Sequence, residues 1–183
     1  DRALALGLPA VCITDHFDPF YPVREFFLDT PSYYRTLEEV REEYRGRLDV
    51  RIGVEIGLTP GGTDYVSEYI RSYPWDYVIG SVHQIGEKDP YYRDTFDTSD
   101  QEMNRLYFET TLENVQKAEG IHSLGHLDYV VRYGYRKGED YDWREYQEII
   151  DEILNVLVKR GIALEVNTGG LKYGLGFPNP HPG

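Results

Sequence analysis

Three histidines and one glutamate stand where short apolar runs of the sequence end, and residues of these types could share metal ions. They are His16, Glu55, His83 and His126. Imidazole nitrogen together with carboxylate oxygen suits Zn, Mn or Fe. One histidine at the end of a buried strand is more often a hydrogen-bonded structural residue than a ligand. The full set, with a glutamate that could bridge two ions, predicts a divalent metal site, and Glu55 is also a catalytic candidate.

The apolar runs that lead to these residues are predicted to be parallel strands. They cover residues 11–14, 51–58, 77–82, a run that leads into Gly125, and 162–166. Helical spacing, capping residues and glycine stops predict helices over 33–47, 64–72, 99–119 and 143–160. Polar residues at the ends of strands that alternate with helices are typical of a β/α barrel. We therefore predict an α/β fold, part of a TIM-like barrel with helices outside. The first run is apolar throughout, which favours burial of both its faces.

Carboxylates and a further histidine lie close to the predicted metal ligands. Asp128 follows His126 by two residues, so on a strand both side chains would face the same side. Asp128 could bind metal, orient a ligand or donate a proton as a catalytic residue. Asp15 could either orient His16 or serve in a turn. His122 is expected at the opposite end of its strand, where a structural role is favoured.

Three loop cations and one amide are candidates for binding a substrate. Arg132, Lys172 and Arg24 lie near the expected mouth of the barrel, and phosphate recognition needs such groups. Each of them alone is more often a solvated charge. Arg132 is the best candidate because it comes just after the predicted fourth strand. Asn167 is a candidate polar anchor at the end of the fifth strand.

The composition limits the class of partner. The net charge is -13 at pH 7 over 183 residues, which disfavours nucleic acid and membrane surfaces because both are polyanionic. A small phosphate ester in a locally positive metal pocket remains compatible with this charge. Cys12 is the single cysteine, so an internal disulfide is impossible. Without a long apolar span, we expect a cytoplasmic protein with no membrane partner.

Taken together, the segments resemble the PHP (polymerase and histidinol phosphatase) superfamily, and within it the monofunctional histidinol-phosphatase branch. The resembling pieces are residues 5–16, 53–58, 76–83, 125–128 and 164–171, in the order of the family. The Thr-Asp-His piece that ends at His16 and the Gly-Ser-Val-His piece that ends at His83 are specific in combination. The Gly-His-Leu-Asp piece is weak by itself.

The resemblance implies a distorted (β/α)7 barrel with a site for up to three divalent ions. It implies that Glu55 bridges two ions, that His83 and His126 complete the shell of one of them, and that His16 serves a separate ion. The implied reaction is metal-dependent hydrolysis of L-histidinol phosphate to L-histidinol and phosphate, a phosphoric monoester hydrolysis in histidine biosynthesis. Two alternatives are a PHP phosphoesterase of other specificity, including a nuclease, and an incomplete barrel used for binding.

Two motifs of the family have no counterpart in residues 1–183. The resemblance implies an H-x-H motif before the first residue and an Asp-x-His motif after the last. We therefore expect a single barrel domain, 1–183, truncated at both ends, which by itself hydrolyses little or no substrate. The function implied is that of the whole protein.

Overall fold

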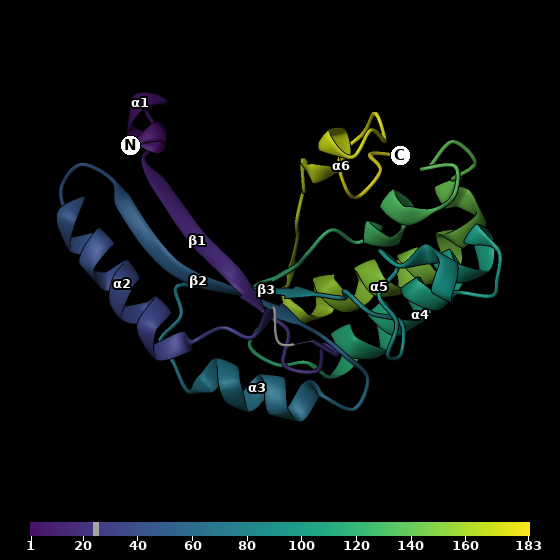
Figure 1. Cartoon of the computed structure of the whole chain (residues 1–183), viewed down its shortest axis with the longest axis horizontal. Helices are drawn as coiled ribbons and strands as arrows, with labels where there is room; N and C mark the ends of the chain where they lie inside the picture. The colour runs from purple at the N-terminus through teal and green to yellow at the C-terminus, as the bar shows by residue number, and fades with distance from the viewer. Residues whose placement is uncertain (24–25) are drawn as a thin grey trace.

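The computed structural model describes residues 1–23 and 26–183, and its five strands form one parallel sheet. The strands are β1 (Ala10–Phe17), β2 (Asp49–Gly57), β3 (Tyr77–Ser81), β4 (Ser123–Leu124) and β5 (Ala163–Leu164). Their order in the sheet follows their order in the chain (Figure 1). Because each strand is added at the same edge, the carboxyl ends of all five lie along one rim. The predicted α/β arrangement of parallel strands is confirmed.

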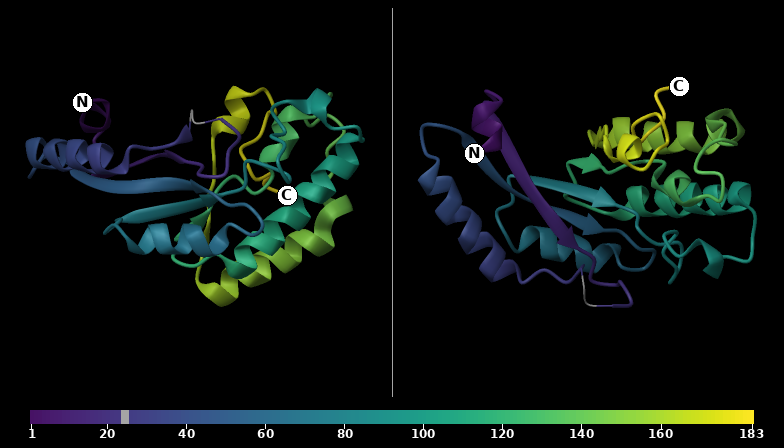
Figure 2. Two further views of the ribbon diagram at one scale, coloured as in Figure 1. Left: turned by 60° about the horizontal axis from the view of Figure 1, so that its bottom comes forward. Right: turned by 45° about the horizontal axis from the view of Figure 1, so that its top comes forward.

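Helices connect the strands. They are α1 (Arg2–Ala5), α2 (Thr30–Glu43), α3 (Thr63–Arg71), α4 (Asp100–Lys117), α5 (Gln147–Arg160) and α6 (Gly169–Lys172), with 3-10 turns η2 (Arg93–Thr95), η3 (Tyr129–Tyr133) and η4 (Trp143–Tyr146). In both views of Figure 2, α4 and α5 lie side by side, and α2 runs along β2. None of the helices in the described ranges is both long and apolar enough to cross a membrane.

Local signals explain where the main helices begin and end. The Ser99 side chain caps α4 by accepting the backbone N–H of Glu102 at 3.1 Å. Gly161 ends α5 with a left-handed φ of 67°, a conformation that glycine adopts without steric cost. The helix expected over 33–47 begins and ends earlier, because Asp29 provides its N-terminal cap. An Asp side chain before a helix satisfies free backbone N–H groups.

The core lies between the later strands and the helices α3, α4 and α5. On β2, Val54 and Ile56 are fully buried, and they belong to one apolar cluster with Met103 and Phe108 of α4 and Ile153 of α5. A strand whose apolar residues are all enclosed moves little, because closely packed interiors resist displacement. The end of β2 is therefore a rigid support for the polar residues of the rim.

Strand β1 is less buried than its apolar sequence predicts. Residues 11–14 are each only partly buried, so the prediction that both faces of this run are buried is wrong. The physical reason is position: within the described chain, β1 is one of the two edge strands and pairs only with β2. Tyr33 of α2 nevertheless ties the two strands together, because its hydroxyl donates to the carbonyls of Ile13 (3.0 Å) and Gly53 (2.9 Å).

Candidate functional site

The four predicted ligands converge around one carboxylate. Glu55 Oε1 lies 3.1 Å from His83 Nε2 and 3.2 Å from His126 Nε2. The other oxygen, Oε2, lies 3.7 Å from His16 Nε2. Glu55 thus contacts all three imidazoles, although the residues come from four different segments. We call these four residues the histidine cluster.

The strand register explains the convergence. His16 on β1 pairs directly with Glu55 on β2 in the parallel ladder. His83 follows the end of β3 by two residues, and His126 follows the end of β4 by two residues. Because neighbouring parallel strands end along the same rim, the four side chains meet there. The backbone N–H of His126 also donates to the carboxylate of Glu165 at 2.8 Å, which fixes the chain after β4.

A fifth residue, Asp18, belongs to the site and was not a candidate from the sequence. Its Oδ1 lies 2.6 Å from His83 Nδ1, and its Oδ2 lies 3.5 Å from His16 Nδ1. A signal for it exists in the sequence at Gly57, the last residue of β2. A Cβ at that position would lie 2.1 Å from Asp18 Oδ1, so only glycine lets the carboxylate approach. Asp15 is exposed, and its backbone N–H donates to the Tyr33 hydroxyl at 3.3 Å.

Burial and hydrogen bonding act against each other on the charges of the cluster. Burial disfavours the ionised form of Glu55, but its hydrogen bonds to His126 and His83 outweigh this and lower its pKa. Burial also opposes a charge on His83, yet Asp18 and Glu55 raise the pKa of His83 to about 10. Burial lowers the pKa of His126 despite its contact with Glu55. In the metal-free chain, His83 therefore holds a proton between two carboxylates, and His126 stays neutral.

Three members of the cluster, His16, Glu55 and His83, could hold a divalent cation. One ligand atom each from His16, Glu55 and His83 can be chosen so that all lie within 4.8 Å of one another. Donors bound to one Zn ion are separated by roughly 3–4 Å, and the distances of 3.1 and 3.7 Å from Glu55 to the two imidazoles lie in that range. Asp18, on the far nitrogen of His83, matches the carboxylates that commonly orient ligating histidines.

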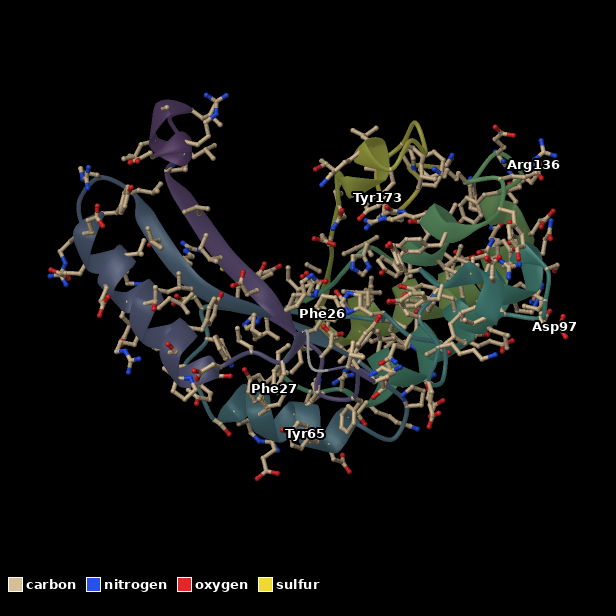
Figure 3. The ribbon with its side chains drawn as sticks, in the orientation of Figure 1. Phe26, Phe27, Tyr65, Asp97, Arg136 and Tyr173 are labelled. Atoms are coloured by element: carbon tan, nitrogen blue, oxygen red, sulfur yellow. The ribbon has the colours of Figure 1, made fainter. Side chains whose placement is uncertain are left out.

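A cavity of about 490 Å³ lies over the cluster. One wall consists of Asp18 and the histidine cluster, and the rest is mainly aromatic. The aromatic lining residues are Tyr21, Phe26, Tyr91, Tyr92, Tyr129, Tyr133 and Tyr173, and the remaining ones are Asp89, Arg132 and Asn167. In Figure 3, the labelled Phe26 lies near the end of β1 and Tyr173 lies on the segment of α6. Cavities of this size hold small organic ligands.

Arg132 is a buried cation at the edge of this cavity, with a relative exposure of 8%. Its Nε donates to Asn179 Oδ1 at 2.6 Å, and its Nη2 donates to Asn167 Oδ1 at 2.9 Å. The guanidinium also lies 5.2 Å from the ring centres of both Tyr129 and Tyr173. In the described parts of the chain, no carboxylate forms an ion pair with it. A fixed guanidinium that is not neutralised can bind the oxygens of a phosphate group.

Asp128 lies elsewhere. The chain leaves β4 at Leu124, so Asp128 precedes η3 and is not on a strand with His126 as expected. It is 1% exposed and does not line the cavity. Its Oδ1 accepts from Asn179 Nδ2 at 2.5 Å, and its Oδ2 accepts from the backbone N–H of His181 at 2.8 Å. Burial raises the pKa of Asp128.

Of the remaining candidates from the sequence, Asn167 lines the cavity beside Arg132. Lys172, in α6, is exposed and does not line it. Arg24 lies outside the described residues. His122 accepts the backbone N–H of Val78 at 3.0 Å and stacks on Tyr77, away from the cavity lining.

Comparison with protein families gives one match over most of the chain. The model of the PHP domain matches residues 1–169. Among curated proteins, a histidinol-phosphatase of Lactococcus lactis is 36% identical over 169 residues, which cover 91% of this chain and 63% of that protein. A probable histidinol-phosphatase of Clostridium acetobutylicum is 36% identical over 161 residues, 86% of this chain and 61% of that protein. The chain therefore spans less than two thirds of the length of these relatives.

Solved structures of two proteins have a fold similar to that of this chain. The crystal structure of a histidinol phosphate phosphatase from Lactococcus lactis, complexed with Zn, L-histidinol and phosphate, matches with a TM-score of 0.84 and 35% identity. The match covers 91% of this chain and 64% of that one. A structure from Listeria monocytogenes matches with a TM-score of 0.83 at 20% identity, covering 98% of this chain and 78% of the other. The second likeness concerns the fold alone. Both support the predicted barrel architecture.

Proposed function

The chain belongs to the PHP domain family, and we propose that it is part of a histidinol-phosphatase. Such an enzyme hydrolyses L-histidinol phosphate to L-histidinol and phosphate in histidine biosynthesis. One observation carries the proposal: a single carboxylate, Glu55, contacts three imidazoles at the wall of a cavity of about 490 Å³. The proposal concerns the whole protein, because the chain covers 63% of its Lactococcus relative. That relative has been solved with Zn, L-histidinol and phosphate.

We propose His16, Glu55, His83 and His126 as the residues of this chain that hold metal. Glu55 has two oxygens that face different imidazoles, so it could serve two ions at once. When bound, divalent ions such as Zn, Mn or Fe, up to three in the whole protein, would supply Lewis acidity that activates water and neutralises phosphoryl charge. Asp18 would hold the ring of His83 in the orientation that ligation needs.

Arg132 would bind the phosphoryl oxygens. Asn167 and Asn179 already fix its guanidinium, so little reorganisation is needed when charge develops on those oxygens. Asp128 holds Asn179 through a 2.5 Å hydrogen bond. We therefore propose Asp128 as a positioning residue that acts on the phosphate through Asn179 and Arg132. Asn167 lines the cavity and is proposed to bind substrate together with Arg132. Lys172 could contact substrate only if α6 moved, since it is outside the lining.

The test is phosphate release from L-histidinol phosphate by the whole protein, with and without Glu55→Ala. We expect the variant to lose at least about 100-fold in kcat/KM and to bind less metal in elemental analysis. Undiminished activity would exclude a metal role for Glu55. A wild-type protein that hydrolyses p-nitrophenyl phosphate but not histidinol phosphate would instead indicate a PHP phosphoesterase of other specificity. Wild-type protein that holds no metal would favour a barrel used for binding.

A further inference from the structure

The cavity contains one carboxylate that does not contact the histidine cluster. The carboxylates of Asp18 and Glu55 are both engaged by imidazoles. Asp89 also lines the cavity, but its Oδ2 accepts from the Tyr21 hydroxyl at 2.5 Å and its Oδ1 accepts from the backbone N–H of Tyr91 at 2.7 Å. No lysine, arginine or histidine in residues 1–23 or 26–183 forms an ion pair with it. Asp89 is thus held in place while its charge is not neutralised.

Several aromatic residues line the cavity together with this carboxylate. Tyr91 contacts the ring of Tyr92 at 5.0 Å between centroids and the ring of Tyr133 at 5.7 Å, both in edge-to-face geometry. Between β1 and α2, the Tyr21 ring lies 5.0 Å from the Phe26 ring, measured between centroids. Aromatic rings near a carboxylate form a setting that attracts organic cations. A small anion would be repelled there, so this part of the cavity calls for a positively charged group.

Two lining residues of the cavity, Asp89 and Arg132, carry opposite charges. The chain of ring contacts continues from Tyr133 to Tyr129 at 5.1 Å, and the guanidinium of Arg132 lies over Tyr129. The contacts thus lead from the anionic Asp89 to the cationic Arg132. A ligand that spans the cavity would place a negative group at Arg132 and the histidine cluster, and a positive group at Asp89. Such charge complementarity selects one ligand over another mainly by penalising the wrong charge.

We propose that Asp89, with the rings of Tyr21, Tyr91 and Tyr133, is a subsite for a cationic nitrogen, and that it selects phosphate monoesters whose organic part is positively charged. The inference rests on the proposed function, because it assumes that the phosphoryl group lies at Arg132. In L-histidinol phosphate the cationic nitrogen would be the ammonium or the protonated imidazole. Either group can form a charge-assisted hydrogen bond with the carboxylate.

The experiment compares two substrates in the metal-loaded whole protein. Asp89→Asn keeps a side-chain oxygen for the Tyr21 hydroxyl and removes the charge. We expect kcat/KM for L-histidinol phosphate to fall about 10- to 100-fold, mostly through KM, as for a lost charge-assisted hydrogen bond. With p-nitrophenyl phosphate, whose organic part carries no positive charge, we expect a change of less than about 3-fold. Equal losses on both substrates, or no loss on either, would overturn the proposal.

The matched control is Asp97→Asn. Asp97 is exposed, follows the same strand β3, and lies at the outer edge of the molecule, away from Phe26 (Figure 3). It does not line the cavity, so neither substrate should distinguish this variant from wild type. A loss in Asp97→Asn equal to that in Asp89→Asn would overturn the proposal, because it would make the effect one of loop charge in general.

Further measurements identify which nitrogen of the substrate Asp89 binds. They also separate a failure of the Asp89 proposal from a failure of the proposed function. If Asp89 binds the ammonium, Asp89→Asn will not affect the des-amino analogue, and if it binds the imidazolium, the loss will persist there. Calorimetric titration with L-histidinol should show weaker binding to Asp89→Asn, whatever the turnover.

If the wild type does not hydrolyse histidinol phosphate, the proposed function is wrong. The Asp89 proposal is then tested by O-phosphoethanolamine against p-nitrophenyl phosphate, and a variant that does not discriminate overturns it.

Discussion

The cavity has two walls that are built differently. The wall of Asp18 and the histidine cluster comes from the ends of strands and the residues just after them. The side chains of His83 and His126 are 8% and 4% exposed, and His16 is the exposed member at 45%. The other wall consists of Asp89 and the aromatic residues named above and comes from loops, from η3 and from the end of α6; there Tyr91 and Tyr92 are 62% and 56% exposed. We call these the histidine wall and the tyrosine wall.

The difference indicates a division of labour. Groups that share a metal ion must be held within fractions of an ångström, and the strand ladder with its buried core provides that rigidity. Groups that recognise the organic part of a substrate can come from loops, which vary more easily than the frame that carries them. Changes in the histidine wall should therefore abolish reaction, and changes in the tyrosine wall should alter which substrate reacts.

The largest effect is expected for His83→Gln. This change removes a proposed metal ligand, the imidazole that lies nearest to the buried carboxylates of Asp18 and Glu55. We expect kcat to fall roughly 100- to 1,000-fold, together with metal content, measured by phosphate release and elemental analysis. His122→Gln is the matched control, since His122 lies at the amino end of its strand, where it accepts a backbone N–H and stacks on Tyr77. Similar losses in both variants would contradict the assignment.

The next largest effect is expected for Asp18→Asn, and Asp15→Asn is its matched control. Asp18 contacts His83 and His16, whereas Asp15 is exposed. Loss of a carboxylate that orients a ligating histidine commonly costs about 10- to 100-fold in metal affinity or activity, so we expect that loss for Asp18→Asn and little change for Asp15→Asn. Metal titration of both variants is the measurement. The reverse ranking would show that the residue next to His16 in sequence, and not the one in contact, orients it.

These two aspartates also illustrate what sequence alone could predict. The strand ends were predictable because β-rich runs stop at His16, Glu55, His83 and His126, and parallel strands in sequential order bring their ends to one rim. Asp18 lies just beyond that reach, in a loop whose path no periodicity fixes. Its one signal, Gly57, becomes readable only once the two segments are known to touch.

Asp128 was misplaced for a related reason. The argument from alternation assumed that the strand continues to Asp128, but β4 ends at Leu124 and the chain turns into η3. Side-chain alternation holds only while the backbone stays extended. Asp89 and the tyrosines of its wall could not be assigned from sequence, since loop residues acquire a shared cavity only through tertiary packing.

A smaller effect is expected for Arg132→Lys. Lysine keeps the charge but lacks the planar fork whose separate nitrogens bond Asn167 and Asn179 in the guanidinium. We expect inhibition by inorganic phosphate to weaken about 10-fold and KM to rise for cationic and neutral substrates alike. That uniform rise distinguishes Arg132 from Asp89 on the tyrosine wall. Lys172→Gln is the control, because Lys172 lies outside the lining, and a loss as large as that of Arg132→Lys would place α6 at the substrate.

The smallest effect is a pH dependence of folding that belongs to the histidine wall. Burial opposes the ionised forms of Glu55 and Asp18, but hydrogen bonds from the histidines lower both pKa values. Their stabilising contribution is present above their ordinary values near 4 and is lost as the pH falls. His83 behaves in the opposite way: its pKa is raised to about 10, so its contribution is complete below 6.5 and is lost as the pH rises towards 10.

Burial lowers the pKa of His126, so its neutral form favours folding above the ordinary value of 6.5, and this contribution is lost as the pH falls. The metal-free protein should therefore be most stable near pH 6.5, and should lose on the order of 2 kcal/mol towards acid and towards alkaline pH from this group of charges. Urea midpoints measured in chelator from about pH 4 to about pH 9 provide the measurement.

His83→Gln should remove the alkaline limb and weaken the acid limb only in part, because His126 still bonds Glu55 and His16 still contacts Asp18. Tyr133→Phe should leave the profile unchanged over the same range: burial raises the pKa of Tyr133 further above 10, beyond the measured window. A profile that Tyr133→Phe alters as much as His83→Gln would mean that the charge balance is shared by both walls, and the division of labour would then fail.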